Sequence, residues 1–303
     1  MADELIVALA FDGRARVVVA ETTGVVERLR AIHDTGPTLT AALGRLATGA
    51  LLMAATLEKV TEREPVLTVK VEGDGPAGRL IATASPLGWV RAFAENPRAG
   101  AATRADGKLD VAAVVGRSGT LEVVRDPGIG VPYRGVVELV SGELAQDLAH
   151  YLTESEQLPA AVGLGVYVVP QGRVEHAGGF IVQALPGLGE EGTAELEERV
   201  RALGPVTRRL REGDSADDIV RALLPAGGRV LARRAVQFRC GCSEDRVERA
   251  LKLLGAEEVK KVLAQARREP VFLTCHFCHR QYPASPRLLE RLLRELEAEG
   301  RGR

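Results

Sequence analysis

The sequence predicts an α+β protein in three parts: a sandwich-like α+β domain over residues 1–187, a helical linker over 188–237 and a small four-cysteine domain over 238–303. Three observations support this prediction. Strand-like segments come before and after helices without regular alternation, which favours α+β over a doubly wound sheet. After residue 187, glycine and proline separate short, highly charged helical segments. All four cysteines lie in the last part, and the first 239 residues contain none.

The composition is that of a globular protein. The 40 Lys+Arg nearly balance the 41 Asp+Glu, and hydrophobic residues make up 46 %, which excludes disordered and collagen-like classes. Charge near zero argues against a protein that mainly neutralises phosphates. The N-terminus is acidic where a signal peptide would be basic, and the apolar stretch over 46–57 is too short to cross a bilayer. We therefore expect a cytoplasmic protein with no membrane partner.

The first domain begins with strand-like segments over 5–10 and 15–20, joined by a turn at Asp12-Gly13. A helix is expected over 25–33. A second helix starts after Gly36, with Pro37 at its first position, and continues to residue 54. Its apolar residues recur every three to four positions, so one face of this helix should be buried.

The hexapeptide over 73–78 matches the G-x-G-x-x-G pattern of dinucleotide-binding loops. Such a loop must open a helix whose N-terminus faces the pyrophosphate. Here strand-like segments over 66–71 and 80–84 flank the hexapeptide, and Pro76 lies inside it. We therefore interpret these glycines as a hairpin loop.

Further strands are expected over 120–124, 136–140, 163–169 and 179–185. Between them, a helix is predicted over 141–152, with Ser141 as its N-cap and Glu143 in its first turn.

The linker contains two amphipathic stretches. Residues 193–203 place Leu196, Val200 and Leu203 on one narrow stripe. Ser215 and Asp218 resemble a capping box that starts a second helix, which includes Leu223 and ends near Leu224 before a proline. Helices this short depend on docking a thin apolar face. The linker is either an ordinary connector or an element that undocks at modest cost.

The last domain carries two cysteine pairs, Cys240-Gly-Cys242 and Cys275-His-Phe-Cys278. Ser243 can cap a helix that ends before Gly255, a second helix follows over 256–266, and a strand over 271–274 leads to the second pair. Two thiol pairs on separate turns match the four-ligand requirement of a structural zinc site. Clustered cysteines in a cytosolic chain favour metal or redox chemistry over a disulfide scaffold.

The neighbouring histidines compete as ligands. Four cysteines already complete a structural zinc site. His276 and His279 are therefore expected either to be exposed to solvent or to contact the cysteine ligands without binding the metal. His33, His150 and His176 are isolated and are read as structural. The chain carries no nucleophile elbow and no P-loop, so we expect no enzymatic activity.

Two functions fit a four-cysteine module. One is a structural zinc module that binds nucleic acid, but residues 240–303 hold 13 Lys+Arg and 10 Asp+Glu, a net of +3 that four thiolates and Zn²⁺ reduce to +1, which is a poor phosphate-binding surface. Alternatively, the thiolates act as a switch. Zinc keeps the sulfurs deprotonated, the form that oxidants attack, and each closely spaced pair could form a small disulfide. Metal loss would then remove roughly 10–16 kcal/mol of folding free energy.

Several motifs resemble one known family. The segments over 236–243 and 275–282 are similar to the zinc module of the heat shock protein 33 family, the redox-regulated holdase chaperones. The resemblance extends over nearly the whole chain, in family order. It includes the following segments: 41–45, 73–76, 115–121, 132–135, 155–159 and 177–183.

The resemblance implies an activity and its regulation. The reduced chain would bind one Zn²⁺ through Cys240, Cys242, Cys275 and Cys278 and be inactive. Oxidation would form the disulfides Cys240–Cys242 and Cys275–Cys278 and expel zinc. The last domain and the linker would then unfold, and the chain would dimerise and hold unfolding client proteins without ATP. Thiol reductants and ATP-dependent foldase chaperones would serve client release.

From the apolar stripes we expect the client-binding residues to be Leu196, Val200, Leu203, Leu223 and Leu224. A thiol oxidoreductase remains an alternative, although such an enzyme normally uses a single C-x-x-C pair on a stable βαβ scaffold. The nucleic-acid-binding zinc protein is the other alternative, and it would show affinity with a clear salt dependence.

Overall fold

The computed structural model describes residues 2–57, 63–100 and 103–301, and it divides into two compact units, residues 1–239 and 240–303. The functional division of the chain at residues 187 and 237 remains a prediction. No helix in the described part of the chain is long and apolar enough to cross a membrane.

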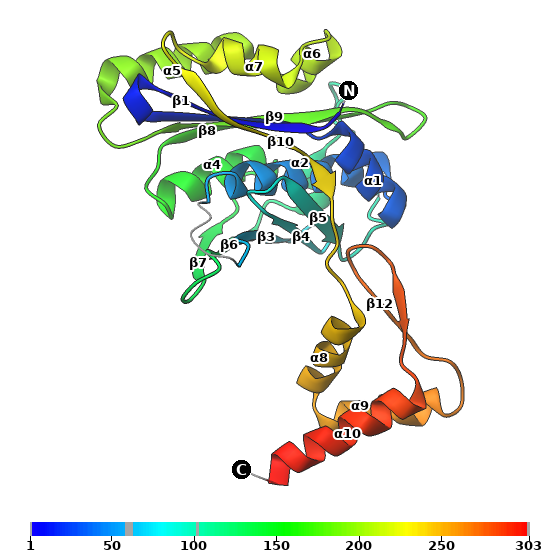
Figure 1. The fold of residues 1–303 in the computed structure, drawn as a ribbon. Helices are drawn as coiled ribbons and strands as arrows, with labels where there is room; N and C mark the ends of the chain where they lie inside the picture. Colours follow the sequence, from blue (N-terminus) through cyan, green and yellow to red (C-terminus); the bar gives the residue numbers. More distant parts are fainter. Residues whose placement is uncertain (1, 58–62, 101–102, 302–303) are drawn as a thin grey trace. The chain divides into compact units, whose positions relative to one another are not determined.

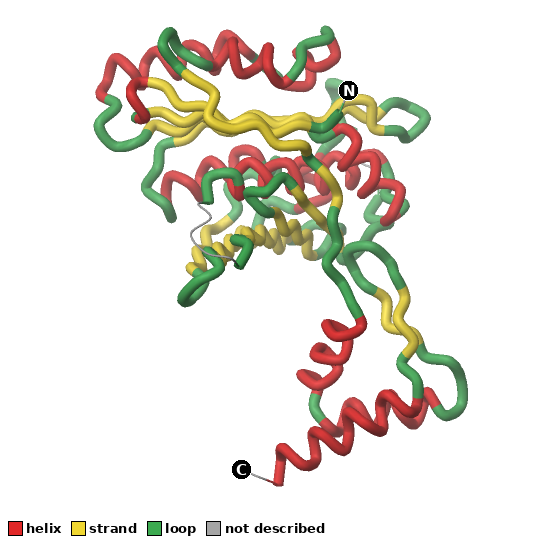
Figure 2. The backbone as a smooth tube through the Cα atoms, viewed as in Figure 1, coloured by secondary structure: helices red, strands yellow, loops and turns green. Residues whose placement is uncertain are grey.

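The first unit is built on two sheets (Figures 1 and 2). The five-stranded sheet has the order β10-β1-β2-β9-β8, and all its neighbours are antiparallel. Its strands are β1 (Glu4–Ala10), β2 (Ala15–Glu21), β8 (Ala160–Val168), β9 (Val174–Ala184) and β10 (Arg229–Ala235). The six-stranded sheet has the order β11-β5-β4-β3-β6-β7. Its strands are β3 (Val66–Gly73), β4 (Arg79–Ala84), β5 (Trp89–Ala94), β6 (Gly119–Asp126), β7 (Tyr133–Glu138) and β11 (Gln237–Phe238).

Three helices fill the space between the sheets (Figure 1): α1 (Thr23–His33), α2 (Pro37–Ala54) and α4 (Ala145–Glu154). The central helix α2 contacts strands of both sheets, so nearly every one of its residues is buried rather than one face alone. Small residues such as Gly44 and Gly49 allow this, since a Cβ at Gly49 would lie 2.4 Å from Leu148 Cδ1. The predicted one-sided burial of this helix is therefore wrong, because the sequence could not show that a second sheet covers its other side.

The outer face of the five-stranded sheet is covered by the linker helices α5 (Gly189–Leu203), α6 (Val206–Arg211) and α7 (Ala216–Leu223). Together they form a second core on this face. The approach of α6 is close, since a Cβ at Gly165 would lie 2.3 Å from Thr207 Cγ2. The predicted capping box is confirmed: Ser215 accepts from the Asp218 backbone N–H, and the Asp218 carboxylate accepts from Ser215.

The C-terminal part of the linker is extended rather than helical. Strand β10 pairs with β1, and β11 pairs in parallel with β5, so this segment completes one edge of each sheet. The sequence analysis assigned no strand here. Strand β10 contains three arginines and is mostly exposed, so it lacks the alternation of apolar and polar residues that marks a half-buried strand.

The glycine-rich hexapeptide forms a hairpin loop between antiparallel strands β3 and β4, as predicted. The Asp74 carboxylate accepts hydrogen bonds from the backbone N–H groups of Arg117 and Ser118. These N–H donors are therefore occupied within the protein, and the segment after the loop is a strand. The loop therefore lacks the helix N-terminus that a phosphate site needs.

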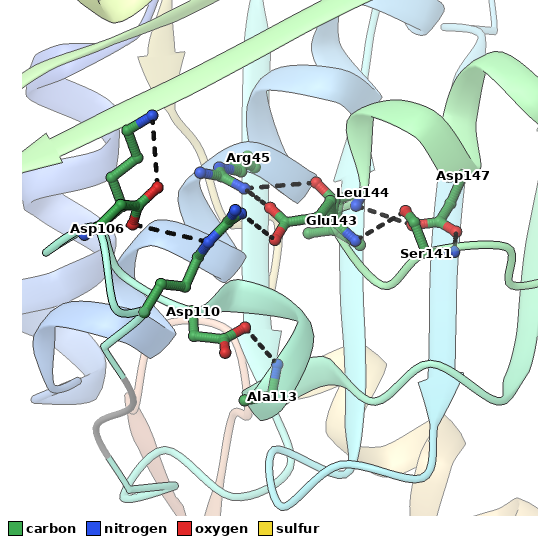
Figure 3. A network of polar contacts seen from close by, with 10 residues as sticks. Arg45, Asp106, Asp110, Ala113, Ser141, Glu143, Leu144 and Asp147 are labelled. Atoms are coloured by element: carbon green, nitrogen blue, oxygen red, sulfur yellow. Dashed lines mark hydrogen bonds and ion pairs between the residues drawn. The ribbon is translucent and has the colours of Figure 1, made fainter.

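The prediction of a helix starting after Ser141 is wrong. Helix α4 begins at Ala145. The buried Asp147 carboxylate accepts hydrogen bonds from the backbone N–H groups of residues 140–142 and 144, of which Figure 3 shows those from Ser141 and Leu144. Next to it, Glu143 forms ion pairs with Arg45 of α2 and with Arg104 (Figure 3). These contacts hold the chain before α4 in a tight loop. The backbone N–H groups that precede α4 are bonded to the Asp147 side chain, so they do not form the backbone hydrogen bonds of an additional helical turn.

The second unit is small. It contains α8 (Glu244–Leu254), α9 (Ala256–Ala266), the hairpin of β12 (Phe272–Thr274) and β13 (Gln281–Pro283), and α10 (Pro286–Arg301). Its core is formed by Leu251, Val259, Leu263, Ala284, Leu289 and Leu292. Helix α10 was not predicted, although its leucines recur at helical spacing behind Pro286, a favourable first residue.

Candidate metal centre

Two local structures present the four thiols, and both lie within the second unit. Cys240 and Cys242 precede α8, whose N-cap Ser243 accepts a hydrogen bond from the Arg246 backbone N–H at 3.4 Å, as the sequence predicted. Cys275 and Cys278 lie in the turn that joins β12 to β13. That turn is closed by a hydrogen bond of 2.9 Å from the Cys275 backbone N–H to the Arg280 carbonyl.

The four sulfur atoms form one cluster. All Sγ atoms lie within 4.8 Å of one another, with Cys240 Sγ 3.7 Å from Cys275 Sγ and Cys242 Sγ 3.4 Å from Cys278 Sγ. All four residues are free thiols and partly buried. A tetrahedral ZnS₄ site with Zn–S bonds of about 2.3 Å has S···S edges of about 3.8 Å. The donor set and its spacing therefore fit a four-coordinate zinc ion.

The thiols do not titrate alike. Burial raises the pKa of Cys240, and burial together with the neighbouring thiols raises the pKa of Cys278 to about 12. Burial also acts to raise the pKa of Cys242, but hydrogen bonds from Tyr282 and the adjacent thiols outweigh it and lower this pKa to about 7. The thiolate, which is the form that ligates metal, is therefore favoured more at Cys242 than at Cys240 or Cys278.

Tyr282 is a site residue that the sequence analysis did not single out. It lies in β13 with 7 % of its surface exposed, and its Oη donates a hydrogen bond to Cys242 Sγ at 3.1 Å. The available signal was a lone tyrosine four residues after the second cysteine pair, in a short strand. Without the hairpin, nothing in the sequence indicates which cysteine it meets.

The histidines do not join the cluster. Within the described part of the chain, the group able to hold a metal ion consists of the four cysteines, and the side chains of His276 and His279 are exposed. His33 is buried, and its Nε2 lies 2.9 Å from the Ala92 carbonyl oxygen, so it is structural as predicted.

The five predicted client-binding residues belong to the first unit, whereas the four cysteines belong to the second. Leu196, Leu203 and Leu223 are buried on the outer face of the five-stranded sheet. Val200 and Leu224 are partly buried against the same cluster. These side chains are thus covered in the folded chain, and their role in client binding stays a prediction.

Comparison with known proteins decides the family. The model of the Hsp33 protein family matches residues 3–285. This chain belongs to the Hsp33 family. Among curated Hsp33 relatives, the 33 kDa chaperonin of Bacillus velezensis is 40 % identical over 96 % of this chain and 98 % of its own. The 33 kDa chaperonin of Desulforamulus reducens is 41 % identical over 98 % and 99 %.

A solved Hsp33 structure confirms the fold. The crystal structure of the 33 kDa chaperonin from Thermotoga maritima matches with a TM-score of 0.86 and 30 % identity, over 99 % of this chain and 100 % of that one. The resemblance seen in the sequence motifs and the predicted α+β class are therefore both confirmed.

Proposed function

We propose that this Hsp33 chain is a redox-regulated, ATP-independent holdase that binds unfolding proteins and prevents their aggregation under oxidative and heat stress. Its relatives are named chaperonins. The observation that carries the proposal is the single cluster of four free thiols, partly exposed and within 4.8 Å of one another. The proposal assigns binding of client proteins rather than catalysis.

The resting form would hold one zinc ion through Cys240, Cys242, Cys275 and Cys278. When bound, zinc would keep all four sulfurs as thiolates and join the two turns. The second unit has a small core of its own, so metal ligation would supply much of its stability.

Oxidation would remove the ligands. A peroxide takes two electrons from one thiolate to give a sulfenic acid, and a second thiol condenses with it to form a disulfide and water. Family resemblance assigns the disulfides to Cys240–Cys242 and Cys275–Cys278. Since all four sulfurs lie close together, proximity alone does not select this pairing.

Undocking of the linker would then expose two apolar surfaces. One is the helix stripe of Leu196, Val200, Leu203, Leu223 and Leu224. The other is the sheet face beneath it, formed by Ile6, Ala8, Val17, Val19, Phe180 and Val182. An open pocket of 460 Å³ lies between α5 and strands β8 and β9, next to Leu196 and Val200.

The activated chain would form a homodimer in the cytoplasm. Thiol reductants and ATP-dependent foldase chaperones would then serve the release of clients. These partners are inferred from the family resemblance, and each is testable by reconstitution with purified components.

The deciding experiment follows zinc and chaperone activity in the same samples. The reduced chain is treated with peroxide at elevated temperature, zinc is detected with a chromogenic chelator, and aggregation of citrate synthase is scored. We expect about one zinc per chain to leave as aggregation is suppressed, and dithiothreitol with zinc to reverse both.

Two variants sharpen this test. Cys278→Ser should weaken zinc binding and raise activity in the reduced state, whereas the matched control His276→Ala should keep one zinc and remain inactive. Zinc that leaves without any gain in suppression would reduce the site to a structural role. Turnover in an insulin-reduction assay would favour the thiol oxidoreductase alternative. Salt-dependent binding of nucleic acid would favour the alternative of a nucleic-acid-binding zinc protein.

A further inference from the structure

The cysteine cluster is contacted by a side chain from outside it. Tyr282 lies 40 residues from Cys242 in the sequence, yet its Oη donates to Cys242 Sγ at 3.1 Å. Pairing of Leu273 with Tyr282 in the β12–β13 hairpin, together with near-complete burial of the ring, sets the position of the hydroxyl.

The direction of this hydrogen bond follows from its two partners. A thiolate can only accept, so the phenol O–H of Tyr282 donates to Cys242 Sγ.

The donor to Cys242 is a side-chain hydroxyl rather than a backbone group. A single substitution can therefore remove this donor without altering the fold of the turn.

A hydrogen bond to a thiolate withdraws electron density from the sulfur and makes it a weaker nucleophile. We propose that Tyr282 is a positioning residue of the thiol switch, whose hydroxyl selectively shields Cys242 from electrophiles and so sets how readily the cluster reacts. The inference rests on the proposed function, in which the thiolates are the sensor.

The test measures which sulfur reacts. Wild-type chain and Tyr282→Phe, both reduced and loaded with zinc, are treated with limiting iodoacetamide, whose iodide each sulfur displaces. Peptide mass spectrometry then gives the alkylation rate of Cys242 relative to Cys275 in the same molecule. We expect this ratio to rise about tenfold in Tyr282→Phe, since hydrogen bonds to charged groups are among the stronger ones.

A second variant and a control protect the test. Tyr282→Leu also removes the hydroxyl from this buried position, so the ratio should rise by a similar factor. Tyr133→Phe removes an exposed hydroxyl of the first unit and should leave the ratio unchanged. An unchanged ratio in Tyr282→Phe, or equal acceleration of all four cysteines, would overturn the inference, because loosening of the module affects every sulfur.

Failure of the proposed function is recognised separately. A wild-type chain that takes up no zinc would refute the metal-bound resting state. The Cys242-to-Cys275 ratio would still be measured in the metal-free reduced chain, at a pH high enough to ionise the thiols, where the same hydrogen bond predicts a rise in Tyr282→Phe.

Discussion

Replacing Leu223 with alanine should release the linker helices without oxidation. Leu223 is fully buried in α7, in the cluster that docks the linker on the five-stranded sheet. Truncating a buried leucine to alanine costs about 2–5 kcal/mol. If the substitution destabilises the docked linker relative to the undocked linker by about 2.7 kcal/mol, the undocked population rises about a hundredfold.

Hydrogen exchange provides the assay, with aggregation suppression measured on the same reduced, zinc-loaded protein. We expect faster exchange in α5, α6 and α7 with unchanged protection in α2, β3 and β4, and a gain in suppression. Leu253→Ala is the control, because that side chain is 88 % exposed and its loss should cost less than about 0.5 kcal/mol.

Two results would refute this reasoning. Equal loss of protection throughout the first unit would show that the linker does not undock as a separate element. Faster exchange in α5–α7 without any gain in suppression would show that the surface covered by the linker does not bind clients.

Three further predictions follow from local contacts. Ser215→Ala removes the cap of α7 and should cost about 1 kcal/mol, which hydrogen exchange of that helix will detect, whereas Ser215→Asp should retain the cap. Asp147→Ala leaves several backbone N–H groups without their acceptor and should lower the unfolding free energy in urea by about 3 kcal/mol or more; a loss under 1 kcal/mol would mean that water replaces the carboxylate. Arg239 lies 5.8 Å over the ring of Trp89, the single tryptophan of the chain, so Arg239→Ala should change the intrinsic fluorescence of the reduced protein, and an unchanged spectrum would contradict this contact.

The sequence predicted those elements whose residues carry local signals. The four cysteines could be assigned to one site because thiolate pairs with this spacing are chemically distinctive. The caps at Ser215 and Ser243 were readable because a capping side chain bonds within its own first turn. The hairpin at Gly73 was readable because strand-like segments flank it on both sides.

Elements whose identity depends on distant partners were missed. Strand β10 is an exposed edge strand that is ordered by pairing with β1, more than 200 residues away in the sequence, so its own residues carry little pattern. Helix α2 is buried all round because a sheet lies on each side of it. The start of α4 was misplaced because Asp147, inside the helix, binds the N–H groups before it.

The sequence by itself determined the assignment of the four cysteines to one module, the α+β class and the apolar stripes of the linker, since each depends on residue type and short spacing. Only the tertiary structure decided that the stripes cover the outer face of the five-stranded sheet, and that Tyr282 donates to Cys242. The physical reason is that hydrogen bonds and packing across 40 or more residues require the chain to be folded before the partners can be known.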